Sequence, residues 1–590
     1  MLTPWEAAVR QLPIPAALRP FVIPPKIQRR YEQAASGAPD AFLDSFLKSM
    51  DVKPVVSDSD LERIPRQGPL VIVANHPFGL LEGLIVARLL DQVRPDVRIL
   101  ANSVLGFVPE MSPRLILVDP FKAKASVGVN GKGVREALGW LGRGGALLAF
   151  PAGEVSHFDI RQRAITDPEW NEKLIRFVRH TQSTVVPMFI NGANSLAFQL
   201  MGMVNAHLRT ARLLHELANK DHQRVEIRVG APVEWAKLRE LGSDADSIRY
   251  LRYRTYLLSH RTGAQAAPAV MKHRVPVAEE VPVELIEREV TALGPDQRLG
   301  ENGGLEIYLA EAGQIPAALA EIGRLREIAF RAEGEGTGHA RDLDSYDTYY
   351  QHLFLWSRTE RRIAGAYRLS SSREVLSSRG IGGLYTSSLF AYRPEFFARL
   401  GPAIELGRSF VRPEFQKQYA PLLLLWKGIA TVAARRPDHP ILFGAVSISN
   451  GYQPVSRRLI VRYLEAYQSR TDLAGLVRAR KPFRAERRGS DNESISLMLR
   501  DAEELSEVTA DIEPDRKGIP ILLKQYLRLG GKLVGFNVDP RFSDALDGLI
   551  MVDLRQTPAA ILQRYMGREN ATRFVEYHTQ STASDLQPRG

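Results

Sequence analysis

The stretch LVIVANHPFG, residues 70–79, decides the fold of the first half of the chain. Its first five residues form an uninterrupted apolar run, which is typical of a strand buried on both faces of a parallel sheet. Pro77 suits the first turn of a helix, and a helix is expected over residues 80–90. The stretch therefore predicts a buried strand, a loop that carries His76, and a helix.

The same alternation of strand and helix continues along the chain and predicts an α/β layered domain. Strands are expected at 97–100, 115–118, 146–150 and 185–190, and helices at 133–141 and 169–180. Residues 263–283 are rich in Pro, Ala and Val and follow neither hydrophobic period, so they are interpreted as a linker. The predicted organisation is an amphipathic arm (1–60), an α/β domain (61–262), the linker, and an α+β domain with a C-terminal extension (284–590).

The composition excludes several classes of protein. The 590 residues are 44% hydrophobic and 25% charged, which is ordinary for a globular protein. The absence of cysteine excludes disulfides, thiolate metal sites and cysteine nucleophiles. No apolar run approaches the roughly 18–20 residues that span a bilayer. We therefore expect a cytoplasmic protein, with no metal, that meets lipid only at a membrane surface.

A net charge of +11 favours anionic partners. Basic residues cluster at 249–261 and 478–488, where each cluster is either a solvated face or a docking face for an acidic protein or anionic lipid. Nucleic acid is disfavoured because no recognition module is present. The segment 2–48 fits a helix at the membrane interface and a domain-packing arm equally well.

His76 follows the first strand, and Glu82 lies in the first turn of the next helix. An imidazole oriented by a carboxylate can act as a general base toward a hydroxyl, although a capping His with a surface Glu is an equally good interpretation of this spacing alone. Two further strand ends carry turn residues: Phe-Pro-Ala-Gly-Glu at 150–154 and Val-Pro-Met-Phe-Ile-Asn-Gly at 186–192.

In this order and separation, these segments resemble the glycerolipid (lysophosphatidic-acid type) acyltransferase family over about residues 60–260. The resemblance implies that His76 is the base and that Glu82 orients it. It also implies that acceptor-binding residues lie at Asn75, Gly79, Pro151, Gly153, Glu154 and Pro187. The spacing here is His-x5-Glu rather than His-x4-Asp, and no Arg closely follows the turn, so we expect an acceptor without phosphate whose cation Glu154 could face.

Four segments of the second half belong to another candidate site. They are Leu325–Phe330 on a predicted helix, the acidic loop Asp344–Asp347, Gly365–Arg368 at a strand end, and Glu405–Phe410 on a further strand. A regular strand would place Glu405 and Ser409 on one face and Arg408 on the other, unless a bulge intervenes. Singly, each segment is more typical of surface charge or salt bridges.

As a set, the four segments resemble the acyl-homoserine-lactone synthase branch of the GNAT superfamily and bacterial N-acyltransferases that acylate ornithine. The resemblance implies that Glu405 is the base for the amine. It implies that Asp344 and Asp347 bind a cationic acceptor, with Ser409 in the same site, while three arginines shape it by ion pairs: Arg326, Arg368 and Arg408.

The acyl donor is expected to be acyl carrier protein with its phosphopantetheine arm, and coenzyme A is the alternative. Members of the superfamily that use coenzyme A hold its pyrophosphate in a glycine-bearing loop that opens a helix. At the corresponding place this chain has Gln-Lys-Gln-Tyr-Ala-Pro, residues 416–421, without glycine.

Together the two domains resemble the bifunctional ornithine lipid synthases, often labelled hemolysin-like, over about residues 60–570. The resemblance implies N-acylation of ornithine by the second domain and O-acylation of the lyso-ornithine lipid by the first, on the inner face of the bacterial inner membrane, without other cofactors. Three alternatives remain. The head group could be another amino acid, such as glycine, glutamine or lysine. One domain could be an inactive docking module. The third alternative is a lytic protein, which is disfavoured because no long amphipathic segment is present.

Overall fold

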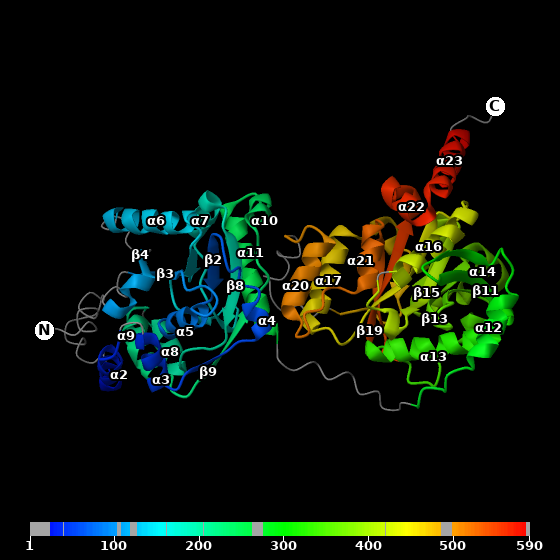
Figure 1. The fold of residues 1–590 in the computed structure, drawn as a ribbon. Helices are drawn as coiled ribbons and strands as arrows, with labels where there is room; N and C mark the ends of the chain where they lie inside the picture. The colour runs from blue at the N-terminus through cyan, green and yellow to red at the C-terminus, as the bar shows by residue number, and fades with distance from the viewer. Residues whose placement is uncertain are drawn as a thin grey trace. The chain divides into compact units, whose positions relative to one another are not determined.

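The computed structural model describes residues 24–38, 41–102, 108–118, 127–160, 162–204, 206–261, 275–418, 420–484 and 498–585. The chain divides into two compact units, residues 1–262 and 263–590 (Figure 1). Each unit has its own sheet and its own buried apolar cluster.

The first unit is built on a seven-stranded sheet in the order β1-β9-β8-β2-β5-β3-β4. All neighbours are parallel except β8 and β9. The strands are β1 (Lys53–Val55), β2 (Leu70–Ala74), β3 (Val97–Asn102), β4 (Leu115–Val118), β5 (Ala146–Ala149), β8 (Thr184–Ile190) and β9 (Arg224–Val229), and a small hairpin joins β6 (His157–Asp159) to β7 (Ala164–Thr166).

Strand β2 lies centrally and is buried along its whole length, as its continuous apolar sequence predicts. The helices of this unit are α2 (Pro25–Ala35), α3 (Phe42–Ser49), α4 (Asp58–Leu61), α5 (Leu81–Leu90), α6 (Val127–Gly142), α7 (Lys173–Thr181), α8 (Leu196–Val204), α9 (Ala206–Ala218), α10 (Trp235–Glu240) and α11 (Asp244–Leu257).

The described part of the N-terminal arm packs inside the first unit. Helices α2 and α3 bury Ile27, Tyr31 and Phe46 in the same apolar cluster as β2 and α5. Between the two interpretations of this arm, the described residues therefore favour domain packing. Residues 1–23 lie outside the described part of the chain.

The second unit is built on an eight-stranded sheet in the order β10-β11-β12-β13-β15-β16-β19-β18. Its strands are β10 (Arg298–Asn302), β11 (Leu305–Glu311), β12 (Gln351–Ser357), β13 (Arg362–Ser371), β15 (Ala403–Val411), β16 (Ile441–Ile448), β18 (Lys532–Asp539) and β19 (Ala545–Asp553). Only β15 and β16 run parallel, and their pairing extends from Ala403 to Leu406 and then stops. Beyond that point the two strands leave a gap in the hydrogen-bond ladder in the middle of the sheet.

Helices and short segments surround this sheet. The helices are α12 (Val283–Ala292), α13 (Pro316–Ala332), α14 (Ser372–Arg379), α15 (Pro394–Leu400), α16 (Ala420–Arg435), α17 (Pro454–Tyr467), α18 (Thr471–Ala474), α20 (Ala502–Ile512), α21 (Ile521–Arg528), α22 (Ala559–Met566) and α23 (Arg568–Asp585). Strands β14 (Phe390–Tyr392) and β17 (Val477–Ala479) form a separate pair, and the 3-10 turn η9 (Tyr385–Ser388) precedes β14.

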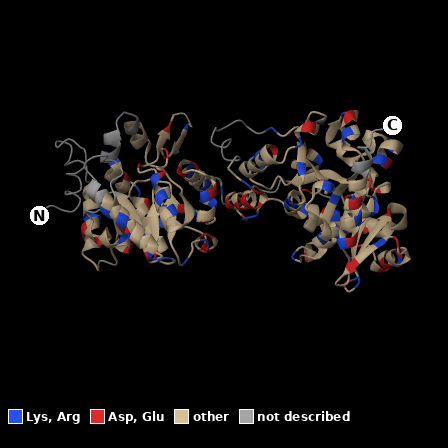
Figure 2. Ribbon diagram, turned by 90° about the horizontal axis from the view of Figure 1, so that it is seen from above, with Lys and Arg blue, Asp and Glu red and all other residues tan. Residues whose placement is uncertain are grey.

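Basic residues are distributed over both units (Figure 2). The segment 249–261 is largely α11, and three of its four arginines are used internally, whereas Arg249 is exposed and pairs with Asp246. Arg254 and Arg261 are buried, and Arg261 lies 2.7 Å from Asp60 in an ion pair. Arg252 donates to the carbonyl of Asp167 at 2.9 Å. Within the described ranges, no helix is long and apolar enough to cross a membrane.

Candidate functional sites

The first site lies where β2 ends and α5 begins. His76 Nδ1 lies 2.7 Å from Glu82 Oε1, so the two residues form the pair that the sequence predicts. Glu82 is completely buried, whereas the His76 side chain is 17% exposed. The carboxylate therefore holds one side of the ring while the ring keeps access to solvent.

Gly79 explains how a spacing of five residues still brings the pair together. The backbone N–H groups of Phe78 and Gly79 both donate to Glu82 Oε1, at 3.0 and 2.8 Å. Gly79 has φ +97°, a conformation that favours glycine, and this turn folds the additional residue back over the start of α5. These donors, at a helix N-terminus, stabilise an ionised Glu82.

Two buried polar side chains hold the loop on the sheet. Asn75 accepts from the backbone N–H of Ile190 at 2.7 Å and donates to its carbonyl at 2.9 Å, which joins the ends of β2 and β8. Asp167 accepts from the backbone N–H of His76 at 3.2 Å and from Ser156 at 2.5 Å. Pro187 is buried within β8, opposite Val73. Asn75 and Pro187 thus support the site from the sheet.

The Phe-Pro-Ala-Gly-Glu turn lies beside the histidine. The ring of Phe150 stacks on the His76 ring with centroids 4.5 Å apart. Pro151 accepts from the N–H of Asn171 at 2.9 Å, and Gly153 turns the chain with φ +66°. Glu154, next in the chain, is partly exposed. The turn therefore lies beside His76 and borders the candidate site.

The electrostatics of the pair favour a strong base. Burial alone would lower the pKa of His76, but the charge and hydrogen bond of Glu82, with a contribution from Asp167, raise it. Burial would likewise raise the pKa of Glu82, but His76 and the backbone donors lower it. An imidazole with a raised pKa takes a proton from a hydroxyl more readily once it is itself neutral.

The second site is centred on Glu405, near the start of β15. The residue is 1% exposed. Its Oε1 accepts from the N–H of Thr386 at 2.8 Å, and its Oε2 accepts from the N–H of Tyr385 at 3.1 Å and from the hydroxyl of Tyr350. Burial raises the pKa of Glu405, although these donors counteract the shift. A carboxylate with a raised pKa is suited to accept a proton near neutral pH.

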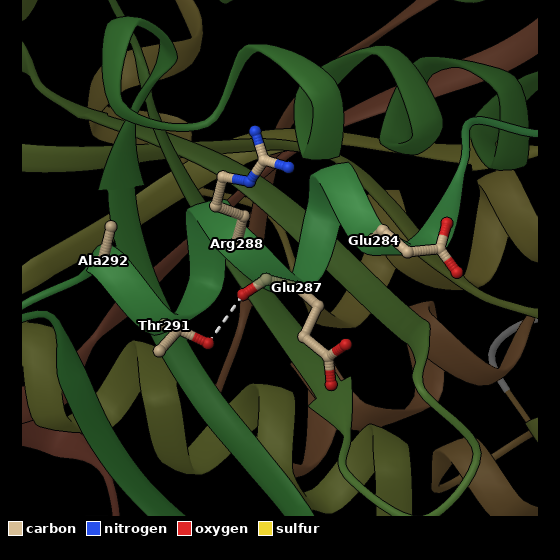
Figure 3. A pocket seen from close by; sticks show the side chains of 5 residues that line it. All are labelled: Glu284, Glu287, Arg288, Thr291 and Ala292. Atoms are coloured by element: carbon tan, nitrogen blue, oxygen red, sulfur yellow. Dashed lines mark hydrogen bonds between the residues drawn. The ribbon is translucent and has the colours of Figure 1, made fainter.

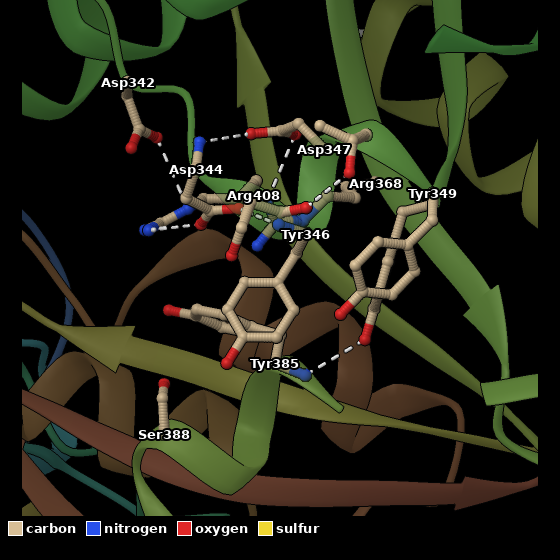
Figure 4. A network of polar contacts seen from close by, with 12 residues as sticks. Asp342, Asp344, Tyr346, Asp347, Tyr349, Arg368, Tyr385, Ser388 and Arg408 are labelled. Atoms are coloured by element: carbon tan, nitrogen blue, oxygen red, sulfur yellow. Dashed lines mark hydrogen bonds and ion pairs between the residues drawn. The ribbon is translucent and has the colours of Figure 1, made fainter. Parts of the chain in front are cut away.

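Arginine–aspartate pairs form a buried network beside Glu405 (Figure 4). Arg326 donates to Asp347 at 2.7 Å, and Arg368 reaches Asp344 at 2.5 Å and Asp347 at 3.1 Å. Burial would raise the pKa of Asp347, but the two guanidinium groups lower it well below its usual range. The carboxylates of Asp344 and Asp347 are therefore already neutralised by arginine.

Arg408 joins this network because β15 contains a bulge. The register between β13 and β15 shifts between Ala366 and Arg368, and Arg408 has φ +52°. Its guanidinium lies 3.4 Å from Asp342 and 3.4 Å from Asp344. The bulge named as the alternative to a regular strand is therefore present, and it places Arg408 on the face of Glu405.

The bulge also moves Ser409. Its side chain lies beside the hydroxyl of Tyr367 on the neighbouring strand β13. The residue after Tyr367 on that strand is Arg368, which belongs to the network. Because successive residues of a strand point to opposite faces, Ser409 lies on the face away from Glu405. Arg408, and not Ser409, shares the face of the candidate base.

Several residues of this site were not predicted from the sequence. Tyr350 and Thr386 donate to Glu405, Tyr385 packs its ring 5.0 Å from the guanidinium groups of Arg368 and Arg408, and Asp342 pairs with Arg408. The several tyrosines next to the acidic loop were the feature of the sequence that could have indicated these residues. Their convergence on Glu405 depends on η9, which no periodicity predicts.

Other concave or acidic features lie apart from these sites. A hollow of about 440 Å³ runs along α12 and is lined by Glu284, Glu287, Arg288, Thr291 and Ala292 (Figure 3). None of its lining residues belongs to either candidate site. Among the residues with described positions, no cluster of His, Asp or Glu could hold a metal ion.

Both units match known protein families. Residues 32–265 match a family described as Acyltransferase, and residues 325–426 match the family described as Acetyltransferase (GNAT) domain. The first range contains His76 and Glu82, and the second contains Glu405 and the arginine–aspartate network. The fold is therefore an acyltransferase-like α/β unit followed by a GNAT unit, as predicted.

Two kinds of relative share sequence with the chain. The glycine N(alpha)-acyltransferase of Bacteroides thetaiotaomicron is 30% identical over 331 residues, which cover 53% of this chain and 95% of the relative. The chain belongs to the family of this N-acyltransferase. The lyso-glycine lipid O-acyltransferase of Phocaeicola vulgatus is 25% identical over 225 residues, which cover 37% of this chain and 77% of that relative.

The relatives define the general class of reaction. The chain is an acyltransferase with relatives that are named for an N-acylation and for an O-acylation in the lipids of an amino acid. Both kinds of relative are named for glycine. The comparisons thus support N- and O-acylation of an amino acid lipid and leave the identity of the amino acid to be argued.

Proposed function

We propose that the chain makes a two-chain ornithine lipid by two successive acyl transfers. The observation that carries the proposal is the presence of two separate candidate bases on one chain: the His76–Glu82 pair in the acyltransferase unit and Glu405 in the GNAT unit. Each unit has relatives whose names describe one of the two reactions. Neither reaction calls for a metal or redox group.

In the first step, the α-amino nitrogen of ornithine attacks the thioester carbonyl of a 3-hydroxyacyl group on acyl carrier protein. Glu405 takes the proton from the nitrogen, directly or through a water. The tetrahedral intermediate collapses, the C–S bond breaks, and the phosphopantetheine thiol leaves with a proton. The product is lyso-ornithine lipid, with one chain in amide linkage.

In the second step, His76 takes the proton from the 3-hydroxyl of lyso-ornithine lipid as that oxygen attacks a second acyl thioester. Glu82 holds the imidazole by Nδ1 and stabilises its charge once it is protonated. The thiol again leaves with the proton. Since the acceptor has no phosphate, the absence of an arginine close after the Phe-Pro-Ala-Gly-Glu turn fits this substrate.

The donor and the location complete the proposal. The basic segment 478–484 is exposed at Arg478, Arg480, Lys481 and Arg484, and Arg480 donates to the carbonyl of Ser387, next to the turn that holds Glu405. An exposed basic strip beside the site suits an acidic carrier protein. Because the product carries acyl chains, we place the chain peripherally on the inner face of the bacterial inner membrane.

A glycine head group is the second candidate, and the names of the relatives favour it. The relatives in question share 23–30% identity with this chain. The two acceptors differ by the ammonium-bearing side chain of ornithine, and a site built to bind such a group would discriminate strongly against glycine. The choice between the two head groups is therefore a question for experiment.

The test is a lipid mass spectrum of a bacterium that lacks amino lipids and expresses the wild type, His76→Ala or Glu405→Ala. We expect two-chain ornithine lipid from the wild type, the one-chain form from His76→Ala, and neither from Glu405→Ala. Glycine lipids in place of ornithine lipids would select the second candidate. A wild type that makes only the one-chain form would leave the first unit as a docking module.

A further inference from the structure

A second group of carboxylates lies on the sheet beside the Glu405 site. Asp547 is on β19, and its neighbours across the sheet are Ser447 on β16 and Asn537 on β18. Ser447 donates to Glu335 Oε2 at 2.8 Å. Asp547 and Glu335 are each 7% exposed, so both residues are more than nine-tenths buried.

These carboxylates lie on the same face of the sheet as Glu405. Glu405 is the register partner of Phe443, and Phe443 is the partner of Met551. Asp547 lies four positions from Met551 along β19, in unbroken register, so its side chain points to the same face. Asp547 lies beside the part of β16 that no longer pairs with β15.

Tyr385 and Arg408 connect the two groups. The backbone of Tyr385 donates to Glu405, while its side chain is close enough to Asp547 and Asp539 for their charges to act on it. Arg408 lies 5.0 Å from the Tyr385 ring, and its charge reaches Asp547. The acids therefore border the same site, on the side away from the Arg368–Asp344 pair.

Asp547 differs from the other carboxylates of the site in its partners. Asp342, Asp344 and Asp347 each pair with an arginine, and Asp539 accepts from the N–H of Arg541 at 2.9 Å. Within the described part of the chain, the Asp547 carboxylate has no hydrogen bond or ion pair. A buried, unpartnered carboxylate is costly and indicates a ligand that supplies the missing charge.

We infer that Asp547 and Glu335 bind a second cationic group, at the far end of the acceptor's side chain, and so select a dibasic amino acid. The inference rests on the proposed N-acylation at Glu405. An ammonium between the two carboxylates would donate to both, and a charge-assisted bond of this kind is shorter and stronger than a neutral one.

The electrostatics agree with this geometry. Burial raises the pKa of Glu335 to about 7, and burial together with repulsion from Asp539 and Glu335 raises the pKa of Asp547 well above its usual range. Desolvation is the largest cause of both shifts, and neighbouring carboxylates add to it: Glu333 for Glu335, and Asp539 with Glu335 for Asp547. A bound ammonium would relieve the repulsion and return both groups to the ionised form.

The test compares two acceptors that differ only in the terminal ammonium. The full-length chain is assayed with 3-hydroxyacyl carrier protein and either ornithine or norvaline, as the wild type, Asp547→Asn and Glu335→Gln. We expect the wild type to favour ornithine by about 100-fold in kcat/KM. Each variant should reduce this ratio at least tenfold through KM for ornithine, with norvaline unchanged. Asp553→Asn, the same substitution at the other end of β19, should keep the wild-type ratio.

Each outcome bears on a different claim. Equal use of ornithine and norvaline by the wild type, or an unchanged ratio in both variants, would overturn the cation site and leave the N-acyltransferase intact. No acylation of any amino acid by the wild type would overturn the proposed function itself. Melting curves identify a variant that does not fold, and the ratio in the other variant then decides.

Discussion

At the scale of single residues, the pKa of His76 should set the lower pH limit of the proposed O-acylation. Glu82 raises that pKa, and the neutral imidazole is the form that accepts a proton. Glu82→Gln should therefore lower the pKa of His76 and move the acid limb of the O-acylation pH profile to lower pH. Loss of the orienting charge should also reduce kcat by about 10²–10⁴-fold.

The check is a profile of kcat/KM against pH with lyso-ornithine lipid as acceptor. Glu172→Gln, at an exposed position before α7, serves as the control and should leave the acid limb in place. An acid limb that stays in place for Glu82→Gln would show that Glu82 does not tune His76.

Tyr350 should set the lower pH limit of N-acylation by the second unit. Its hydroxyl donates to Glu405, which favours the ionised carboxylate and keeps its pKa from rising further. Tyr350→Phe removes this donor, so the pKa of Glu405 should rise and the acid limb of N-acylation should move to higher pH. At neutral pH we expect a loss of about tenfold in rate, since a hydrogen bond to a charged group contributes about 1.5–3 kcal/mol.

The measurement is again a pH profile, with Tyr349→Phe as the matched control. The hydroxyl of Tyr349 donates to the carbonyl of Gly383 and not to Glu405, so its loss should leave the limb in place. A shift of the same size in both variants would contradict the role assigned to Tyr350.

At the scale of elements, the loop between β2 and α5 depends on one glycine. A Cβ at Gly79 would lie 2.8 Å from side-chain atoms of Leu213 and of Val155, and the residue has φ +97°. Gly79→Ala should destabilise the first unit by about 1–3 kcal/mol and displace the donors to Glu82. O-acylation should then be lost, while N-acylation by the second unit continues.

Gly68→Ala is the control that separates the cost of backbone strain from the cost of a steric clash of the added Cβ. Gly68 has φ +82°, but a Cβ there meets nothing within 4 Å. This variant should lose only the stability that the backbone strain costs, and it should keep O-acylation. Thermal unfolding and the ratio of one-chain to two-chain lipid measure the two effects, and equal behaviour of the two variants would contradict the role of the loop.

The sequence predicted most of the first unit because its strands are continuous apolar runs that end in recognisable turns. Strands β2 and β4 were predicted at their observed bounds, and α5 begins one residue later than predicted. The order of strand, loop and helix allowed a His76–Glu82 pair and a capping histidine equally, and the resemblance to the acyltransferase family favoured the pair. Its geometry required the turn at Gly79, which no local pattern specifies.

The second unit was less predictable because its site depends on irregular backbone. Strand β16 was not anticipated, although it completes the parallel pair with β15. The bulge at Arg408 exchanges the faces of Arg408 and Ser409, and a period of two residues cannot reveal it. The Asp547 group is formed by residues more than 200 positions apart along the chain, so only the folded sheet brings Glu335 and Asp547 together.

At the scale of the whole molecule, the exposed segment 478–484 should govern the encounter with the carrier protein. Replacing Arg478 and Lys481 by Glu should raise KM for the acylated carrier about tenfold and remove most of its dependence on salt. The kcat should stay near that of the wild type, because neither side chain reaches Glu405. Initial rates at 50 and 300 mM salt provide the measurement.

The matched control for this surface lies on the same unit. Arg361→Glu and Arg373→Glu reverse two other exposed arginines, whose ion pairs are with Glu287 and Asp438. They should leave KM for the carrier and its salt dependence unchanged. Similar effects of the two pairs of substitutions would indicate a general charge effect rather than a docking segment.

The separation of the two candidate sites into two units leads to a prediction about the intermediate. All the residues assigned to O-acylation lie within 1–262, and all those assigned to N-acylation lie within 263–590. Each unit has its own sheet, so inactivating one site should not damage the other. Chains that carry His76→Ala should therefore still make lyso-ornithine lipid, and chains that carry Glu405→Ala should still acylate it.

Co-expression of His76→Ala and Glu405→Ala should accordingly restore the two-chain lipid that neither variant makes alone. The one-chain product of the first variant would reach the second through the membrane, since an acylated amino acid partitions into the bilayer. The double variant His76→Ala/Glu405→Ala, expressed with wild-type carrier protein, is the control and should make neither lipid. Accumulation of the one-chain form without restoration would mean that the intermediate passes directly between the sites of one chain.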